Sequence, residues 1–274
     1  MTTNYITGPP LAHSLMALRR DGKLYIVHSI MKGLKVMEYK EYLDYAISEN
    51  NTIMWFKLSE KNRKKFNETA AWEWVDKYRE WPYGLRAFLP APIDLAHGTF
   101  PQYLSNEVFI LVGSILNMFM PNLTNLVLGD FINARLHVMN LTLNETSLLA
   151  SEMNMKLEDI MAMPELDDYQ YPNGEQWICS SIIIKIYQVA GVLIDKLHSK
   201  EFTPKDIFQM NIFDRDFKNT RPQVCKDADP NLEYCVIHGK YRIPAANFSR
   251  IDVYPYMNER CAMVPPQYLR EDGC

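Results

Sequence analysis

Residues 10–30 predict a β-hairpin, and this stretch constrains the fold more than any other part of the sequence. Two runs rich in strand-forming residues flank an Asp-Gly pair at positions 21 and 22, a preferred sequence for a two-residue hairpin turn. A two-residue turn fixes the register of the whole hairpin and places Leu15 opposite His28. Because side chains alternate between the faces of a strand, we expect His13 and His28 to project to the same side as diagonal neighbours.

A second stretch predicts a buried helix that begins near a cysteine. Turn-forming residues at 171–176 precede a nearly continuous apolar run from Trp177 to Val189, and Gly191 suits the C-terminal cap of a helix. Cys179 is then expected in or near the first helical turn, where free backbone N–H groups and the helix dipole favour a thiolate over a thiol. That arrangement is typical of a cysteine nucleophile. The alternative is that Cys179 is a small buried core residue.

The composition is that of a soluble globular protein with one large domain or two small ones. Apolar residues make up 47% and charged residues 23% of the 274 residues. The formal charge of -4 and the lack of a clustered basic face argue against nucleic acid as a partner. The longest apolar run, Val108 to Met120, is too short to span a bilayer, so we expect no transmembrane segment. The polar first residues do not form a signal peptide, which indicates a mature or trimmed chain.

Glycosylation triplets indicate the secretory pathway, with the protein either secreted or lysosomal. The chain carries more Asn-x-Ser/Thr triplets than chance would give, which predicts glycans on several of these asparagines. The triplets begin at Asn50, Asn67, Asn122, Asn140, Asn144 and Asn247.

The cysteines are unevenly distributed, and four of the five lie in the last fifth of the chain. A loop-rich tail at 211–274 with four cysteines suits two disulfides. Pairing of neighbours gives Cys225–Cys235 and Cys261–Cys274, although the sequence alone does not fix this connectivity. Cys179 is left without a disulfide partner, and catalysis is one reason to keep a free thiol in an oxidising compartment.

Further elements follow along the chain. The pattern predicts an amphipathic helix at 38–48, a strand at 52–58 and one helix that is capped by Ser59 and runs through Tyr78. A helical block at about 103–162 is interpreted as an insertion in the domain or an integral half of it. Thr203-Pro204 marks another helix start, with a cap residue followed by proline at the first helical position.

A cysteine nucleophile needs a base and usually a third polar group that orients the base. Only His13 and His28, of the six histidines, lie in the predicted hairpin, and they share one face. They are therefore the candidate partners of Cys179, with no metal and no cofactor required. A zinc site made of the same three residues is an alternative, because three ligands leave an open fourth position.

The order of these elements resembles the circularly permuted papain-like superfamily, which includes NlpC/P60-type enzymes and lecithin:retinol acyltransferase-like proteins. The resemblance rests on AHSLMALRRDGKLYIVHS at 12–29 and WICSSIIIKIYQVAG at 177–191, a histidine-bearing hairpin followed much later by a cysteine helix. It implies an α+β, papain-like fold with an antiparallel sheet packed on the Cys179 helix. It also implies a catalytic domain at 1–210, with the helical insertion at about 103–162, and an extension at 211–274 packed on it.

By the same resemblance Cys179 is the nucleophile, His13 the base and His28 the orienting third member, as in the acyltransferase-like branch. The backbone N–H of Cys179 is the expected oxyanion donor. Other permuted members often carry glutamate near position 28, and the Gly-Asp pair that often precedes the histidine strand is missing here. Tyr83, in a Trp-Pro-Tyr-Gly stretch, is a further candidate for the cleft.

The predicted function is a secreted or lysosomal cysteine hydrolase that acts on a peptide, amide or acyl substrate through an acyl-enzyme. One alternative is an acyltransferase, in which a substrate hydroxyl or amine replaces water. The other is a glycosylated extracellular binding or structural protein that keeps the fold without the chemistry. The cleft walls are expected from 80–102 and 164–176, with Trp81, Tyr83, Arg86, Asp167, Asp168, Tyr169 and Tyr171.

Overall fold

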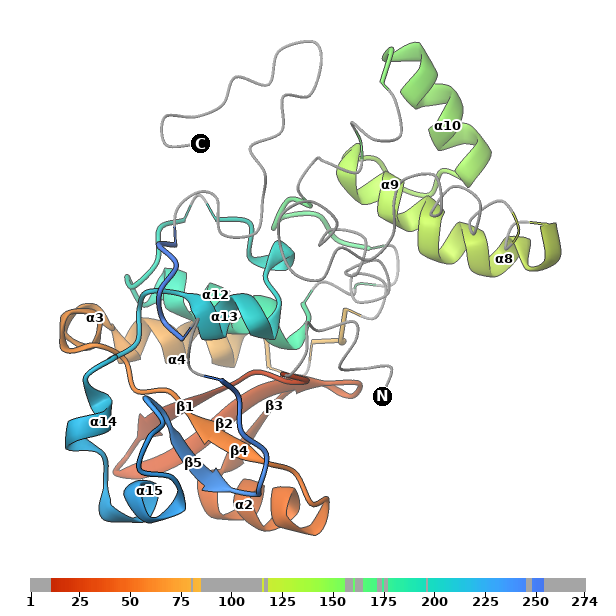
Figure 1. The fold of residues 1–274 in the computed structure, drawn as a ribbon. Helices are drawn as coiled ribbons and strands as arrows, with labels where there is room; N and C mark the ends of the chain where they lie inside the picture. Colours follow the sequence, from red (N-terminus) through yellow and green to blue (C-terminus); the bar gives the residue numbers. More distant parts are fainter. Residues whose placement is uncertain are drawn as a thin grey trace.

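A computed structural model describes residues 11–79, 81–84, 115, 118–155, 160, 165–171, 174, 177–195, 197–244 and 248–253. These residues form a three-stranded antiparallel sheet, a two-stranded antiparallel sheet and surrounding helices (Figure 1). The mixture of helices with small antiparallel sheets confirms the α+β class.

The predicted hairpin is present with the predicted register. Strands β1 (Leu15–Arg20) and β2 (Lys23–Ile30) pair antiparallel, with Leu15 opposite His28. Asp21 and Gly22 have φ angles of 53° and 75°, as a turn with two left-handed residues requires. A third strand, β3 (Gly33–Glu38), pairs with β2 and was not predicted.

Alternate residues of β2 pack on opposite faces of the three-stranded sheet. Val27 packs with α12 (Cys179–Val189) on one face, and Ile26 packs with α2 (Tyr39–Ser48) on the other. Figure 1 shows α12 and α2 on opposite sides of this sheet. The sheet is therefore covered on both faces, which explains why β2 is apolar at most of its positions.

Helix α12 is the centre of the main core, as its apolar sequence predicts. Ile182, Ile184 and Ile186 are each at most 1% exposed, and α12 contacts β1, β2 and α4 (Glu68–Lys77). Gly191 has a φ angle of 78°, and its N–H donates to the carbonyl of Gln188. This confirms the predicted glycine cap.

The single helix predicted from Ser59 through Tyr78 was wrong, because the structure divides it into α3 (Glu60–Lys65) and α4. Phe66 has an extended backbone between them, with a φ of -66° and a ψ of 108°. The Asn67 side chain then accepts a hydrogen bond from the N–H of Ala70 at 3.1 Å. An asparagine that can cap a new helix competes with helix continuation, and here the cap prevails.

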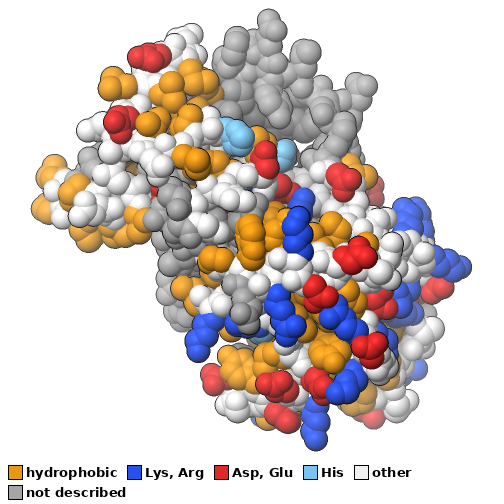
Figure 2. All heavy atoms as spheres, turned by 180° about the vertical axis from the view of Figure 1, so that it is seen from behind, with side chains coloured by type: hydrophobic (Ala, Val, Ile, Leu, Met, Phe, Trp, Pro, Cys, Tyr) orange, Lys and Arg blue, Asp and Glu red, His pale blue; other side chains and the backbone are white. Residues whose placement is uncertain are grey.

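A helical lobe stands to one side of the sheets (Figure 1). It contains α8 (Pro121–Thr124), the π-helical turn η1 (Asn125–Gly129), α9 (Asp130–Arg135) and α10 (Leu143–Glu152). Its own small core contains Leu128, Phe131, Ile132 and Ala150. These helices confirm part of the predicted helical block; most of 103–118 and 156–162 lies outside the described residues. Figure 2 shows hydrophobic side chains gathered on the surface of this lobe.

The C-terminal part is more regular than the predicted loop-rich tail. From residue 211 on it contains α14 (Phe217–Thr220), α15 (Gln223–Ala228) and β5 (Cys235–His238). Two shorter elements, η2 (Ser199–Glu201) and α13 (Pro204–Gln209), come just before it. Thr203 caps α13 through a hydrogen bond from the N–H of Asp206, which confirms the predicted helix start. Strand β5 pairs antiparallel with β4 (Ile53–Trp55), so the tail completes the second sheet.

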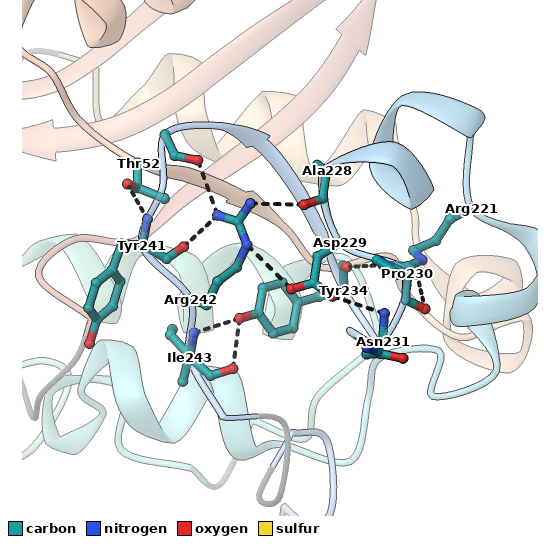
Figure 3. Close-up of polar contacts among 11 residues, drawn as sticks. Thr52, Arg221, Ala228, Asp229, Pro230, Asn231, Tyr234, Tyr241, Arg242 and Ile243 are labelled. Atoms are coloured by element: carbon teal, nitrogen blue, oxygen red, sulfur yellow. Dashed lines mark hydrogen bonds and ion pairs between the residues drawn. The ribbon is translucent and has the colours of Figure 1, made fainter.

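Polar contacts hold the last described segments in place (Figure 3). The hydroxyl of Tyr234 accepts from the N–H of Ile243 and donates to its carbonyl. The buried guanidinium of Arg221 donates to the carbonyls of Tyr234 and Pro230. The Tyr234 ring also packs against Phe248. These contacts join the tail to the main core instead of leaving it as a separate appendage.

The predicted disulfide between Cys225 and Cys235 is present and joins α15 to β5. Cys261 and Cys274 lie outside the described residues. Cys179 is the free cysteine of the described part of the chain, as the count predicted. Within that part, no helix has the length and apolar character needed to cross a membrane.

Candidate active site

Cys179 is the first residue of α12 and is 3% exposed. Ile178 precedes it with an extended backbone, and the Ile178 N–H donates to the hydroxyl of Ser181 at 2.8 Å. This side-chain cap satisfies one backbone group and fixes the start of the helix directly at Cys179. The predicted position in the first helical turn is confirmed.

Four hydrogen-bond donors surround the sulfur of Cys179. They are the hydroxyl of Tyr83 and the backbone N–H groups of Ser14, Ser180 and Cys179 itself, and each of them lowers the pKa of the thiol. Burial has the larger effect and raises the pKa of Cys179 above its ordinary value. The expectation of a resting thiolate was therefore wrong, because the cost of a buried charge exceeds the stabilisation from the helix start.

His13 and His28 are in contact, as the hairpin register predicted. The Nε2 atom of His13 lies 3.2 Å from the Nδ1 atom of His28. His28 is 2% exposed and packs edge-on against Tyr42 of α2, with 5.3 Å between ring centroids. The bond to His28 uses Nε2 of His13 and leaves its Nδ1 as the atom for proton exchange with another group.

The histidine pair and the cysteine helix lie on different faces of the sheet. His28 shares the α2 face with Ile26 and Tyr42, while α12 packs on the face of Val27. The chain just before β1 connects the two sides, because His13 bonds His28 while the N–H of the next residue, Ser14, points at the Cys179 sulfur. In this arrangement of the described residues, neither ring nitrogen of His13 hydrogen-bonds the sulfur.

Both histidines are neutral at pH 7. Burial lowers the pKa of His13 to about 4, with a further contribution from the charge of His28, and burial lowers the pKa of His28 to about 4. The resting state therefore has a neutral thiol at Cys179 and neutral imidazoles at His13 and His28. Transfer of a proton from Cys179 to His13 would create a buried thiolate and a buried imidazolium. It can therefore occur only as the sulfur attacks a substrate and its negative charge moves onto that substrate.

These lowered pKa values predict a loss of stability in acid. An unfolded histidine titrates near pH 6.5, so between pH 6.5 and 4 the unfolded chain binds more protons than the folded chain. Stability is fully present above pH 6.5, and protonation of unfolded His28 alone removes about 3 kcal/mol by pH 4. Urea unfolding across this range measures the loss, and His28→Gln should flatten the pH profile. An equal slope in both proteins would contradict the buried neutral state of His28.

Tyr83 is held against the start of α12 by the backbone. Tyr83 forms a parallel bridge with Trp177, and the N–H of Gly84 donates to the carbonyl of Trp177 at 2.8 Å. A Cβ at position 84 would lie 3.1 Å from the backbone of Trp177, so glycine permits this close approach. Burial and the neighbouring Cys179 raise the pKa of Tyr83, so its hydroxyl stays protonated as a donor.

The expected cleft walls are only partly present as predicted. Tyr169 and Tyr171 are buried at 3% and 2% exposure and pack in a small cluster with Ile178 and Tyr83, so their assignment as open walls was wrong. Asp167 bonds Lys185 of α12 and Ser199 instead of lining a cleft. Asp168 is exposed and lies beside His137, and Arg86 lies outside the described residues.

The structure shows hydrogen-bond donors at the Cys179 sulfur that the sequence could not indicate. The N–H groups of Ser14 and Ser180 point at the sulfur, and a backbone group has no residue-type signature. Tyr83 was found only through the short Tyr-Gly pair that precedes the cysteine helix. A cavity of about 400 Å³ lies away from this site, with Asn62, Leu193 and Phe213 among its lining residues.

The zinc alternative finds no support among the described residues, which contain no group of three His, Cys, Asp or Glu side chains arranged to hold a metal. The glycosylation candidates are compatible with their surroundings. The five that are described, Asn50, Asn67, Asn122, Asn140 and Asn144, are exposed, and Asn247 lies outside the described residues.

The chain was compared with protein-family models, with curated proteins and with solved structures, and none of the three comparisons found a match.

Proposed function

We propose that this chain is a cysteine-dependent hydrolase of permuted papain-like architecture, secreted or lysosomal, that cleaves an amide, ester or thioester bond through an acyl-enzyme. The observation that carries the proposal is the set of donors around Cys179. An unpaired thiol at the start of a buried helix faces three backbone N–H groups and the hydroxyl of Tyr83, beside the chain that carries His13. Such a donor set suits negative charge at that point.

Because the thiol and the base are both neutral at rest, the thiol must lose its proton as it attacks the substrate. The Cys179 sulfur attacks the substrate carbonyl while its proton passes to Nδ1 of His13, and a carbon–sulfur bond forms as the carbonyl oxygen takes up the negative charge. His13 then protonates the leaving group, and the carbon bond to that group breaks. Water resolves the acyl-enzyme by the reverse proton path. In the tautomer that carries its proton on Nε2, His13 donates to Nδ1 of His28, and this bond orients the base.

For this step the His13 side chain must turn toward the sulfur from its position just before β1. His13 precedes the first paired residue of the strand, Leu15, so its side chain can turn toward the sulfur without breaking a strand pair. Catalytic hydrogen bonds often tighten only in the substrate complex. The donor set that now faces the sulfur then becomes available to the substrate oxygen.

Two features support a compartment of the secretory pathway. The Cys225–Cys235 disulfide suits an oxidising environment, and the exposed Asn-x-Ser/Thr triplets suit glycosylation. The proposed substrate is a peptide, an amide or another acyl compound, since each of these presents a carbonyl that the thiol can attack.

The burial of Cys179 favours a second candidate, a glycosylated binding or structural protein without catalysis. The thiol is 3% exposed, its pKa is raised, and His28 packs against Tyr42 on the α2 face of the sheet. A fold that has lost its chemistry would keep these three residues as core packing.

A burst experiment separates the two candidates. The chain is mixed with p-nitrophenyl acetate and with longer p-nitrophenyl esters, and released nitrophenol and intact mass are followed together. The hydrolase predicts one equivalent of nitrophenol and one acyl group on Cys179, both lost in Cys179→Ala. Added hydroxyl or amine acceptors that become acylated instead would assign acyl transfer. No adduct on Cys179 with any ester would leave the non-catalytic protein as the better description.

A further inference from the structure

The cavity of about 400 Å³ lies near the C-terminal end of α12, away from Cys179. It is lined by residues 192–194, which follow the helix, and by residues 211–213. The 11 residues of α12 separate this end from Cys179 by about 15 Å along the helix axis. Small-ligand sites have volumes of roughly 300–1,000 Å³. The cavity therefore has the size of a binding site and is separate from the candidate active site.

Hydrogen bonds fix part of the cavity lining before any ligand binds. The carbonyl of Ile212 accepts from the N–H of Ser59 and from Nδ2 of Asn62, each at 3.0 Å. Leu193, Ile212 and Phe213 are all buried, and they give the cavity an apolar lining. The cavity is therefore preformed, and its buried lining suits an aliphatic group of a ligand.

Asn62 lines the cavity with a hydrogen-bond acceptor that the fold does not use. Asn62 is 8% exposed, and the bond from its Nδ2 to Ile212 fixes the plane of the amide. Its Oδ1 forms no hydrogen bond with any described residue. A nearly buried amide oxygen without a partner is unfavourable. A ligand that donates an N–H or O–H to Oδ1 would supply the missing bond.

Lys61 adds a positive charge to the same lining. It is the one charged side chain among the described residues that line the cavity. The neighbouring carboxylate of Glu60 lies 3.9 Å from the ammonium of Lys64, and the carboxylate of Asp252 accepts a hydrogen bond from Asn211. Lys61 itself makes no ion pair with a described residue. The cavity therefore favours a ligand with an anionic group.

We propose that the cavity binds an N-acylated aliphatic amino acid. The ligand carboxylate pairs with Lys61, the amide N–H donates to Oδ1 of Asn62, and the aliphatic side chain packs on the apolar lining. The C-terminal residue of a peptide presents the same three groups. A fatty acid would match the charge and the apolar lining but would leave Oδ1 of Asn62 without a donor. A neutral apolar molecule would match neither polar group.

NMR titration of the isotope-labelled full chain with N-acetyl-leucine tests the proposal. Saturable binding is expected with a Kd of about 1 mM or lower, as suits a ligand of this size. The ester in which oxygen replaces the amide N–H lacks the donor and should bind about tenfold more weakly. N-acetyl-leucine amide lacks the negative charge and should bind about fivefold more weakly, since water screens an exposed ammonium. A short peptide that ends in leucine should bind at least as tightly if the ligand is a chain terminus, and more weakly if it is the free amino acid derivative.

Variants of the chain locate the ligand. Lys61→Met should weaken binding of N-acetyl-leucine about fivefold and leave the affinity for its amide unchanged. Ile194→Asp places a carboxylate in the lining at a position that is 46% exposed, and it should also weaken binding. Lys64→Met, on the same helix but outside the lining, is the matched control and should bind as the wild type does. Cys179→Ala should also keep the wild-type affinity, because the thiol lies at the other end of α12.

Four results would overturn the proposal. The absence of saturable binding of N-acetyl-leucine would refute the site outright. Equal affinity of Lys61→Met and the wild type would show that the carboxylate binds elsewhere, and equal affinity for the ester would show that Asn62 is not the acceptor. Loss of binding in Cys179→Ala would place the ligand at the candidate active site. The proposed hydrolase is tested by acylation of Cys179, so it stands or falls separately.

Discussion

Replacement of His13 by glutamine is expected to slow acylation of Cys179 by p-nitrophenyl esters about 10³-fold at pH 7, within the range typical of a lost general base. Glutamine can keep a hydrogen bond to His28 but cannot take up the thiol proton. Because burial raises the pKa of Cys179, the uncatalysed thiolate is scarce at neutral pH. The variant rate should therefore rise with pH as hydroxide removes the proton, and the difference from the wild type should narrow in alkali.

The wild-type profile follows from the pKa of the base. His13 has a pKa of about 4 in the folded protein, so acylation should stay level from pH 8 down to 5 and fall as His13 takes up a proton near pH 4. His238→Gln, on β5 of the other sheet, is the matched control and should leave the rate unchanged. If His13→Gln and His238→Gln both react as fast as the wild type, then His13 is not the base.

Replacement of Lys200 by methionine is expected to destabilise the fold by about 3–5 kcal/mol, the cost of breaking a buried ion pair from one side. The side chains of Lys200 and Glu165 are 1% and 4% exposed, with 3.0 Å between Nζ and the carboxylate. Lys200 also donates to the carbonyl of Tyr169. Methionine fills the space but leaves the carboxylate of Glu165 without the ammonium, and urea unfolding measures the difference.

Two further variants show whether burial is the reason. Lys64→Met removes one side of an exposed pair with Glu60, whose side chains are 75% and 74% exposed, and should cost at most about 0.5 kcal/mol. The double variant Lys200→Met/Glu165→Gln removes both charges and should recover much of the lost stability. A double variant as unstable as Lys200→Met alone would show that the charge of Glu165 is not the cause.

Local features of the fold were predictable because their causes lie within a few residues. The Asp-Gly turn set the register of the hairpin, and with it the contact between His13 and His28. The helix starts at Cys179 and Thr203 and the glycine cap at Gly191 were found for the same reason. The helix that was wrongly continued past Asn67 shows the limit, since two valid local signals competed there.

The sequence predicted the position of Cys179 at the helix start and the contact between His13 and His28, but not the electrostatics around the thiol. The helix dipole and free N–H groups at Cys179 are local and were expected to favour a thiolate. The pKa of the thiol is instead raised by burial, which depends on chain segments far apart in the sequence. The buried packing of Tyr169 and Tyr171 against Ile178 was missed for the same reason.

The sequence by itself predicted the contact between His13 and His28, because the two-residue turn fixes the hairpin register and places Leu15 opposite His28. It also predicted a free Cys179 at the start of a buried helix. The pairing of Cys225 with Cys235 was one connectivity that the sequence allowed, and the structure shows it. Only the tertiary structure decided which face of the sheet α12 covers. It placed α12 on the face of Val27, whereas His28 lies on the other face, against α2. That choice depends on how β3, α2 and α12 together bury both faces of one sheet, and no local pattern contains it.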